Sequence, residues 1–154
     1  MRAWLPVLMV ACGSAEPVQL LDNGAWAPVP TGDPLAGLPC SENAWRQEGM
    51  AVEIETEGCS PVALRQTLLE PIEPGDSLEI VWWHDWLFAE EPADGVLSLY
   101  VDGALLYERA EVIPGPPAAW TEGFEASVGG AELVLRIDNH GANTWDVLRL
   151  TRVP

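Results

Sequence analysis

Three tryptophans, a histidine and an aspartate fall within the ten residues EIVWWHDWLF at positions 79–88. Tryptophan rings offer flat apolar surfaces to a ligand, and neighbouring carboxylates can fix its orientation through hydrogen bonds. A histidine beside an aspartate can instead bind a metal ion or transfer protons. Because aromatic side chains also dominate protein cores, the stretch predicts a ligand platform, a metal or catalytic site, or a packed core strand.

A β-strand would divide this stretch between two faces, since successive side chains point to opposite sides. One face begins as an apolar stripe, so we expect Trp82 to lie in the core; its members are Leu78, Ile80, Trp82, His84 and Trp86. The opposite face carries Glu79, Val81, Trp83 and Asp85. Trp83 is therefore the better candidate for an exposed aromatic, and a loop such as FAEEPAD covering it is the alternative.

Short runs that alternate apolar and polar residues fill the chain from residue 50 onward, separated by turn residues. No window of useful length has a helical period. Asp102-Gly103 lies between two runs and predicts a tight hairpin turn with positive φ. The eight predicted strands cover residues 50–57, 62–70, 78–87, 95–102, 104–112, 121–127, 131–138 and 145–153. This pattern predicts an all-β sandwich of two sheets.

The order of these segments resembles a carbohydrate-binding module of the galactose-binding-like jelly-roll fold. The shared pattern spans residues 20–153 and runs through LLDNGAW, VALRQTLLEPIEPGDSLEIVWW, VLSLYVDG, AWTEGFEA, AELVLRIDN and TWDVLRLTRV. The resemblance implies an antiparallel jelly-roll sandwich and a carbohydrate ligand. In such modules an aromatic side chain stacks on a sugar ring while carboxylates bond its hydroxyls, roles that Trp83, Asp85 and Glu79 would fill.

The same modules hold a structural calcium ion, and Asp22 and Asp146 are the nearest matching positions in this sequence. The acidic residue that follows the Asn-Gly pair in the family is absent here. The resemblance therefore implies Ca²⁺ as a structural cofactor, at a site that would lack one of the family's ligands.

Family topology also implies a second polar site, because the strand holding His84 and the strand ending at Asp138 often share a sheet. The segments HD and DNH would then meet at one edge, with His140 beside Asp138. Two histidines and two carboxylates could hold zinc or perform acid–base chemistry. Histidines that only cap loops by hydrogen bonding are the alternative.

The first eleven residues, MRAWLPVLMVA, form a short apolar run after one arginine and predict a secretory signal peptide at residues 1–11. The following LMVACGSAE resembles the lipobox of bacterial lipoproteins. This implies a lipid on Cys12 and a lipid-anchored location in the bacterial cell envelope, and Gly13 after the cysteine implies the outer membrane. An ordinary secretory signal with a chance cysteine is the alternative.

Residues 12–39 are dense in Pro, Gly and Asp and predict a tether, in which only VQLLDNGAW could dock on a domain at 40–154. With Cys12 lipidated, Cys40 and Cys59 remain as a pair in an oxidising compartment and predict a disulfide. It would close a loop of about 20 residues and stabilise the fold by about 3 kcal/mol. A free or metal-binding pair is the alternative.

The formal net charge is −17, with no lysine in the sequence, which disfavours nucleic acid and anionic lipid headgroups as partners. Membrane contact is thus expected through the lipid anchor alone. No GxSxG, HExxH or Gly-rich phosphate loop is present, so we expect no enzyme. Three functions stay open: a surface-anchored glycan-binding module, a structural or protein-interaction lipoprotein of the envelope, and a small metal-dependent enzyme using His84 and His140.

Overall fold

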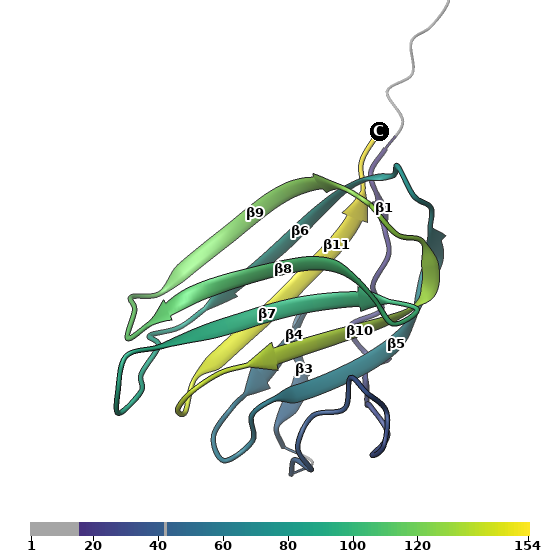
Figure 1. The fold of residues 1–154 in the computed structure, drawn as a ribbon. Coiled ribbons are helices and arrows are strands. Elements are labelled where there is room, and N and C mark those ends of the chain that lie inside the picture. Colours follow the sequence, from purple (N-terminus) through teal and green to yellow (C-terminus); the bar gives the residue numbers. More distant parts are fainter. Residues whose placement is uncertain (1–15, 42) are drawn as a thin grey trace, which may run out of the picture.

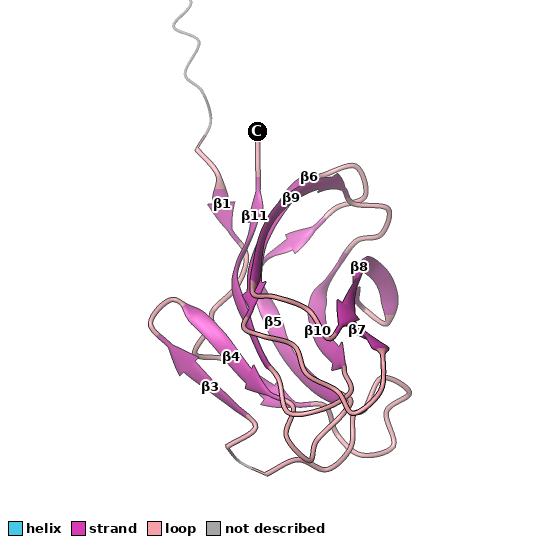
Figure 2. Cartoon of the chain, turned by 90° about the vertical axis from the view of Figure 1, so that its left-hand side faces the viewer, coloured by secondary structure: helices cyan, strands magenta, loops and turns pink. Residues whose placement is uncertain are grey.

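The computed structural model describes residues 16–41 and 43–154 of the chain. Two antiparallel β-sheets pack face to face, with one sheet in front of the other in Figure 1. Seen from the side in Figure 2, the described residues form strands and loops with no helix. Accordingly, these residues include no helix long and apolar enough to cross a membrane. The predicted all-β sandwich of two sheets is confirmed.

The first sheet has the strand order β3-β4-β11-β6-β9, and β1 pairs with a further part of β11. Its strands are β1 (Val18–Gln19), β3 (Trp45–Glu48), β4 (Ala51–Glu55), β6 (Ser77–His84), β9 (Ala118–Glu125) and β11 (Thr144–Arg152). Because β11 lies in the middle of this sheet, it places side chains next to both β4 and β6.

The second sheet has the order β2-β5-β10-β7-β8 and lies in front in Figure 1. Its strands are β2 (Ala27–Pro28), β5 (Val62–Ile72), β7 (Ala93–Val101), β8 (Ala104–Ile113) and β10 (Gly130–Asp138). The turn between β7 and β8 has positive φ at Asp102 and Gly103, as the Asp-Gly pair predicts.

The core lies between the two sheets and follows the alternation of the strands. On β6 the inward residues are fully or nearly fully buried, namely Leu78, Ile80, Trp82 and His84. Trp82 stacks on Trp145 of the neighbouring strand, with 5.7 Å between ring centroids and 20° between planes. The expectation that Trp82 belongs to the core is therefore confirmed.

All eight predicted strands are present, and three short strands were not predicted. The strand predicted to run to residue 87 ends at His84, and Trp86 is 55% exposed. Placing Trp86 on the inward face was thus wrong, because the strand alternation stops before it. Residues 18–38 also do more than tether the domain. In this segment β1 adds to the first sheet, β2 adds to the second, and Leu20 is fully buried in the core.

Cys40 and Cys59 form the predicted disulfide, with 5.4 Å between their Cα atoms. It ties the chain before β3 to the loop that precedes β5. Cys12 and the predicted signal peptide lie outside the described residues. The lipid anchor and the envelope location stay predictions.

Candidate functional site

The end of β6 presents Trp83 on the outer face of the first sheet, where its side chain is 36% exposed. Its Cα partners are Asp146 on β11 and Ala119 on β9. An alanine on one side leaves the indole ring open there, and a carboxylate lies on the other side. Strand alternation predicts the exposed aromatic, whereas Asp146 lies beside it because of the register between β6 and β11.

Glu79 and Asp85, the two acids predicted to lie beside Trp83, have different surroundings. Glu79 forms an ion pair with Arg149 at 2.8 Å. Asp85 uses its Oδ1 to accept a hydrogen bond of 2.7 Å from the backbone N–H of Trp86, and so holds the start of the following loop. Asp85 stays exposed, whereas the charge of Glu79 is already balanced by its arginine.

Trp86 and Phe88 form a second exposed aromatic pair, directly after β6. Their rings are stacked, with centroids 6.5 Å apart and an angle of 27° between planes, and they are 55% and 59% exposed. Leu87 between them is buried and bridges to Gly115. The Asn143 amide accepts from the Phe88 N–H at 2.6 Å and donates to its carbonyl at 3.0 Å. The loop is therefore fixed, and the rings face solvent. Trp83, Trp86 and Phe88 are called the aromatic group below.

Beside this loop lies an open hollow of about 770 Å³. Its walls include the loop after Phe88, with Glu90 and Glu91, and the loop after β10, with His140. These polar side chains can hydrogen-bond a ligand that extends from the aromatic pair. His140 thus lies in a solvent-accessible wall, the position of a binding residue rather than of a buried one.

His84, by contrast, is buried in the core. Its side chain is only 2% exposed and packs against Trp145, with ring centroids 5.2 Å apart. Its Nδ1 is 2.7 Å from the carbonyl oxygen of Asp85. β6 belongs to the first sheet and β10 to the second, so the expectation that His84 and Asp138 share a sheet was wrong. Asp138 instead pairs with Arg136 at 3.2 Å.

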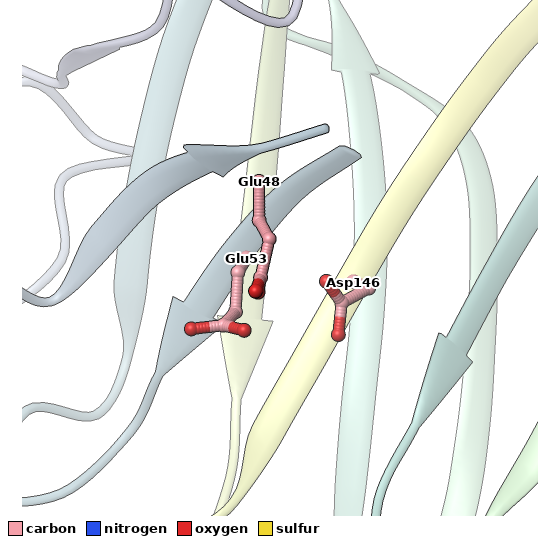
Figure 3. A group of neighbouring side chains, drawn as sticks. All are labelled: Glu48, Glu53 and Asp146. Atoms are coloured by element: carbon pink, nitrogen blue, oxygen red, sulfur yellow. The ribbon is translucent and has the colours of Figure 1, made fainter. Parts of the chain in front are cut away.

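Within the described part of the chain, one group of carboxylates gathers closely. Glu48 of β3, Glu53 of β4 and Asp146 of β11 each offer an oxygen within 4.8 Å of the other two. Figure 3 shows the three carboxyl groups turned toward one another from their strands. Arg46 forms an ion pair with Glu53 from the neighbouring strand. We call Glu48, Glu53 and Asp146 the acidic trio; it lies next to Trp83, whose Cα partner is Asp146.

The trio has unusual electrostatics, since Glu53 and Asp146 are 7% and 2% exposed. Burial raises the pKa of the Glu53 carboxyl to about 7, and Glu48 adds to the increase while Arg46 opposes it. Burial also raises the pKa of the Asp146 carboxyl to about 6, again with Glu48 adding to the increase. Removing such groups from water disfavours their charged forms, so the trio prefers a proton or a cation.

Asp22 does not join Asp146 in this group. It accepts a hydrogen bond of 3.0 Å from the Gly24 N–H and so closes the turn of the Asn-Gly segment. The ligand pair implied by the family resemblance is therefore not the one that the fold brings together. Glu48 and Glu53 were not predicted, because the register that places them beside Asp146 is a long-range property of the sheet.

The outer face of the second sheet carries another partly exposed aromatic, Tyr100 of β7. It lies opposite Val134 of β10, and Arg65 of β5 lies on the other side of Val134. The face thus offers one aromatic ring with polar neighbours. The first sheet and its loop offer three rings, of which two are more than half exposed.

Comparison with solved structures places the chain among β-sandwich modules. A structure described as "CBM4 structure and function" aligns with a TM-score of 0.51 at 8% identity over 90% of this chain and 95% of that one. A family 29 carbohydrate-binding module complexed with mannohexaose aligns at 0.49, with 12% identity over 89% and 90% of the two chains. The second N-terminal cellulose-binding domain of β-1,4-glucanase C from Cellulomonas fimi aligns at 0.45, with 15% identity over 92% and 97%.

At this level of identity the likeness concerns the fold, and the first of these alignments supports the jelly-roll sandwich. No protein-family model and no curated protein matches the sequence.

Proposed function

We propose that this chain is a non-catalytic carbohydrate-binding module that holds a glycan on the aromatic group at the end of β6. The observation that carries the proposal is the exposure of Trp86 and Phe88, which are stacked, fixed in place and turned to solvent. Exposed aromatic pairs are costly to leave in water and mark surfaces that a partner covers.

A sugar ring suits this surface because it has one apolar face of C–H groups and a rim of hydroxyls. The indole and phenyl rings would cover the apolar face, and nearby acids would accept hydrogen bonds from the hydroxyls. Asp85 is one such acid, and Glu90 and Glu91 in the wall of the hollow are two more. Trp83, which lies near the end of β6, would extend the platform over the first sheet.

Carbohydrate binding by the fold neighbours, which include a mannohexaose complex and a cellulose-binding domain, supports the ligand class. The strongly acidic chain, with a net charge of −17, favours neutral or basic glycans over anionic ones, because like charges repel. We therefore expect neutral polysaccharides to bind more tightly than sulfated or uronic-acid polymers.

The test is binding of the purified protein to a panel of soluble polysaccharides by affinity electrophoresis and calorimetry, with Trp86→Ala and Phe88→Ala beside it. We expect each variant to fold normally and to weaken binding at least about tenfold, or about 1.4 kcal/mol. Val112→Ala is the matched control, since Val112 is 68% exposed on β8, in the other sheet.

Binding that survives in both variants but disappears in Tyr100→Ala would move the glycan site to the second sheet. If the protein bound no polysaccharide of the panel, the result would contradict the glycan proposal and favour a structural or protein-binding role in the cell envelope.

We also propose that the module is anchored to the bacterial cell surface by a lipid on Cys12, on the strength of the LMVACGS segment. Replacing this residue, Cys12→Ser, should move the protein from the membrane fraction to the soluble fraction. Equal membrane association of both forms would contradict the anchor and leave the glycan site untouched.

A further inference from the structure

We propose that the acidic trio Glu48, Glu53 and Asp146 is a divalent-cation site that fastens the β3–β4 hairpin to β11. The three carboxylates come from three adjacent strands, so an ion between them would add a direct link among β3, β4 and β11 on the outer face of the sheet. The site is separate from the glycan function and can be tested without any glycan.

The geometry suits a hard cation that prefers oxygen ligands. One oxygen from each carboxylate lies within 4.8 Å of the other two. Two oxygens bound to the same calcium ion at about 2.4 Å can be no more than about 4.8 Å apart. Glu48 is exposed at the mouth of the group, which leaves room for water to complete the coordination.

Asp146 supplies the observation that points to a ligand. Its side chain is only 2% exposed, and its Oδ2 has no hydrogen-bond partner among the described residues. A buried carboxylate oxygen without a partner is costly, because it loses water and gains nothing in exchange. Its carboxyl group is turned toward Glu48 and Glu53 (Figure 3), so the missing partner would lie inside the trio.

Arg46 does not fill this place. It forms an ion pair with Glu53, and its side chain is 58% exposed. One guanidinium leaves two further carboxylates to be balanced, and Arg149 on the same face is already paired with Glu79. Because Arg46 reaches the trio from solvent, it can swing away or stay beside Glu53 when a divalent ion enters.

The donor set differs from the pair that the family resemblance implies. Asp22 closes its own turn through Gly24 and is not part of the trio. Two of the three proposed ligands come from the β3–β4 hairpin, and their positions follow from the register of this sheet alone.

The test is calorimetric titration of the chelator-treated protein with calcium chloride, with the melting temperature measured in chelator and in millimolar calcium. We expect one site per chain and a higher melting temperature with calcium, because the ion binds only the folded chain. Terbium luminescence excited through tryptophan is a second readout, because two tryptophans lie next to Asp146. Trp83 is its Cα partner on β6, and Trp145 precedes it in the sequence.

Three variants make the test specific. Glu48→Gln keeps the shape of an exposed ligand and is expected to weaken calcium binding at least about tenfold. Asp146→Asn is expected to lose the calcium response while melting no lower than the wild type in chelator, because it removes an uncompensated buried charge. Glu125→Gln on β9 is the control for general acidity, and it should bind calcium as the wild type does.

The proposal is overturned if calcium, magnesium and manganese leave the melting temperature unchanged and release no heat. It is also overturned if Glu125→Gln lowers binding as much as Glu48→Gln, since the response would then reflect the overall negative charge. Neither result bears on glycan binding, which is measured on other residues.

Discussion

Trp83 and Asp146 are directly opposite each other on β6 and β11, so one ring of the aromatic group lies beside the acidic trio on the outer face of the first sheet. The indole is 36% exposed, whereas the carboxylate beside it is only 2% exposed. The register thus places a partly open ring beside a buried carboxylate.

Replacing Trp83 with alanine should distinguish a role in glycan binding from a role in the hydrophobic core. We expect glycan affinity to fall at least about tenfold, because the ring is lost from the platform. The free energy of unfolding should fall by only about 1–2 kcal/mol, since much of the ring is already in water. Urea unfolding and calorimetry check both values. A loss as large as that of a core tryptophan, about 3–5 kcal/mol, would identify Trp83 as a core residue instead.

The acidic trio predicts how stability depends on pH in the presence of a chelator. The pKa values of Glu53 and Asp146 rise from 4.5 and 3.8 to about 7 and about 6 in the folded protein. The folded state therefore keeps protons that the unfolded chain has released, and the free energy of unfolding decreases as the pH rises. This contribution is complete below about pH 4 and lost as the pH rises through about 7.

Urea unfolding at several pH values measures this slope, and the double variant Glu53→Gln, Asp146→Asn provides the comparison. The variant should have the flatter profile between about pH 5 and 7, because it cannot release these protons. Profiles of equal slope would mean that the general acidity of the chain, not the trio, determines the dependence.

Gly95 on β7 is expected to tolerate no side chain. An added Cβ would lie 2.8 Å from the Trp145 ring, 3.0 Å from the Asn139 Oδ1 and 3.1 Å from the Ile113 Cδ1. Gly95→Ala should therefore lower the free energy of unfolding by about 1–3 kcal/mol. Gly123→Ala is the control, since its Cβ would meet only the Leu78 carbonyl oxygen at 3.8 Å and should change stability little. Similar losses in both variants would contradict the packing described for β7.

The Cys40–Cys59 disulfide should stabilise the fold without supporting the glycan site. It closes a segment with a sequence separation of 19 residues. Its loss in a Cys40→Ser, Cys59→Ser variant should lower the free energy of unfolding by about 3 kcal/mol. Glycan affinity, measured well below the melting temperature, should not change; a parallel loss of binding would show that the disulfide-bonded loop shapes the site.

The sequence predicted those parts of the fold that depend on local alternation. Eight strands and the Asp102 turn follow from it, as does the burial of Trp82. The strands β1, β2 and β3 are too short to show a period, and they form because the sheets offer them unpaired edges.

The candidate site was predictable only as far as β6 extends. Trp83 follows from alternation, but Trp86 and Phe88 lie in a loop whose direction depends on Asn143, 55 residues away from Phe88 in the sequence. The trio depends on the register of three strands, and the separation of His84 from Asp138 depends on which strands share a sheet. Such long-range pairings leave no signal in a single sequence.

The most direct test of the glycan site is an NMR titration that follows the indole N–H signals of the tryptophans with the tightest-binding glycan of the panel. Signals are assigned by Trp→Phe variants at single positions. We predict that the signals of Trp83 and Trp86 shift, while those of the buried Trp82 and Trp145 do not. Unchanged Trp83 and Trp86 signals at a saturating glycan concentration would contradict the proposed glycan site.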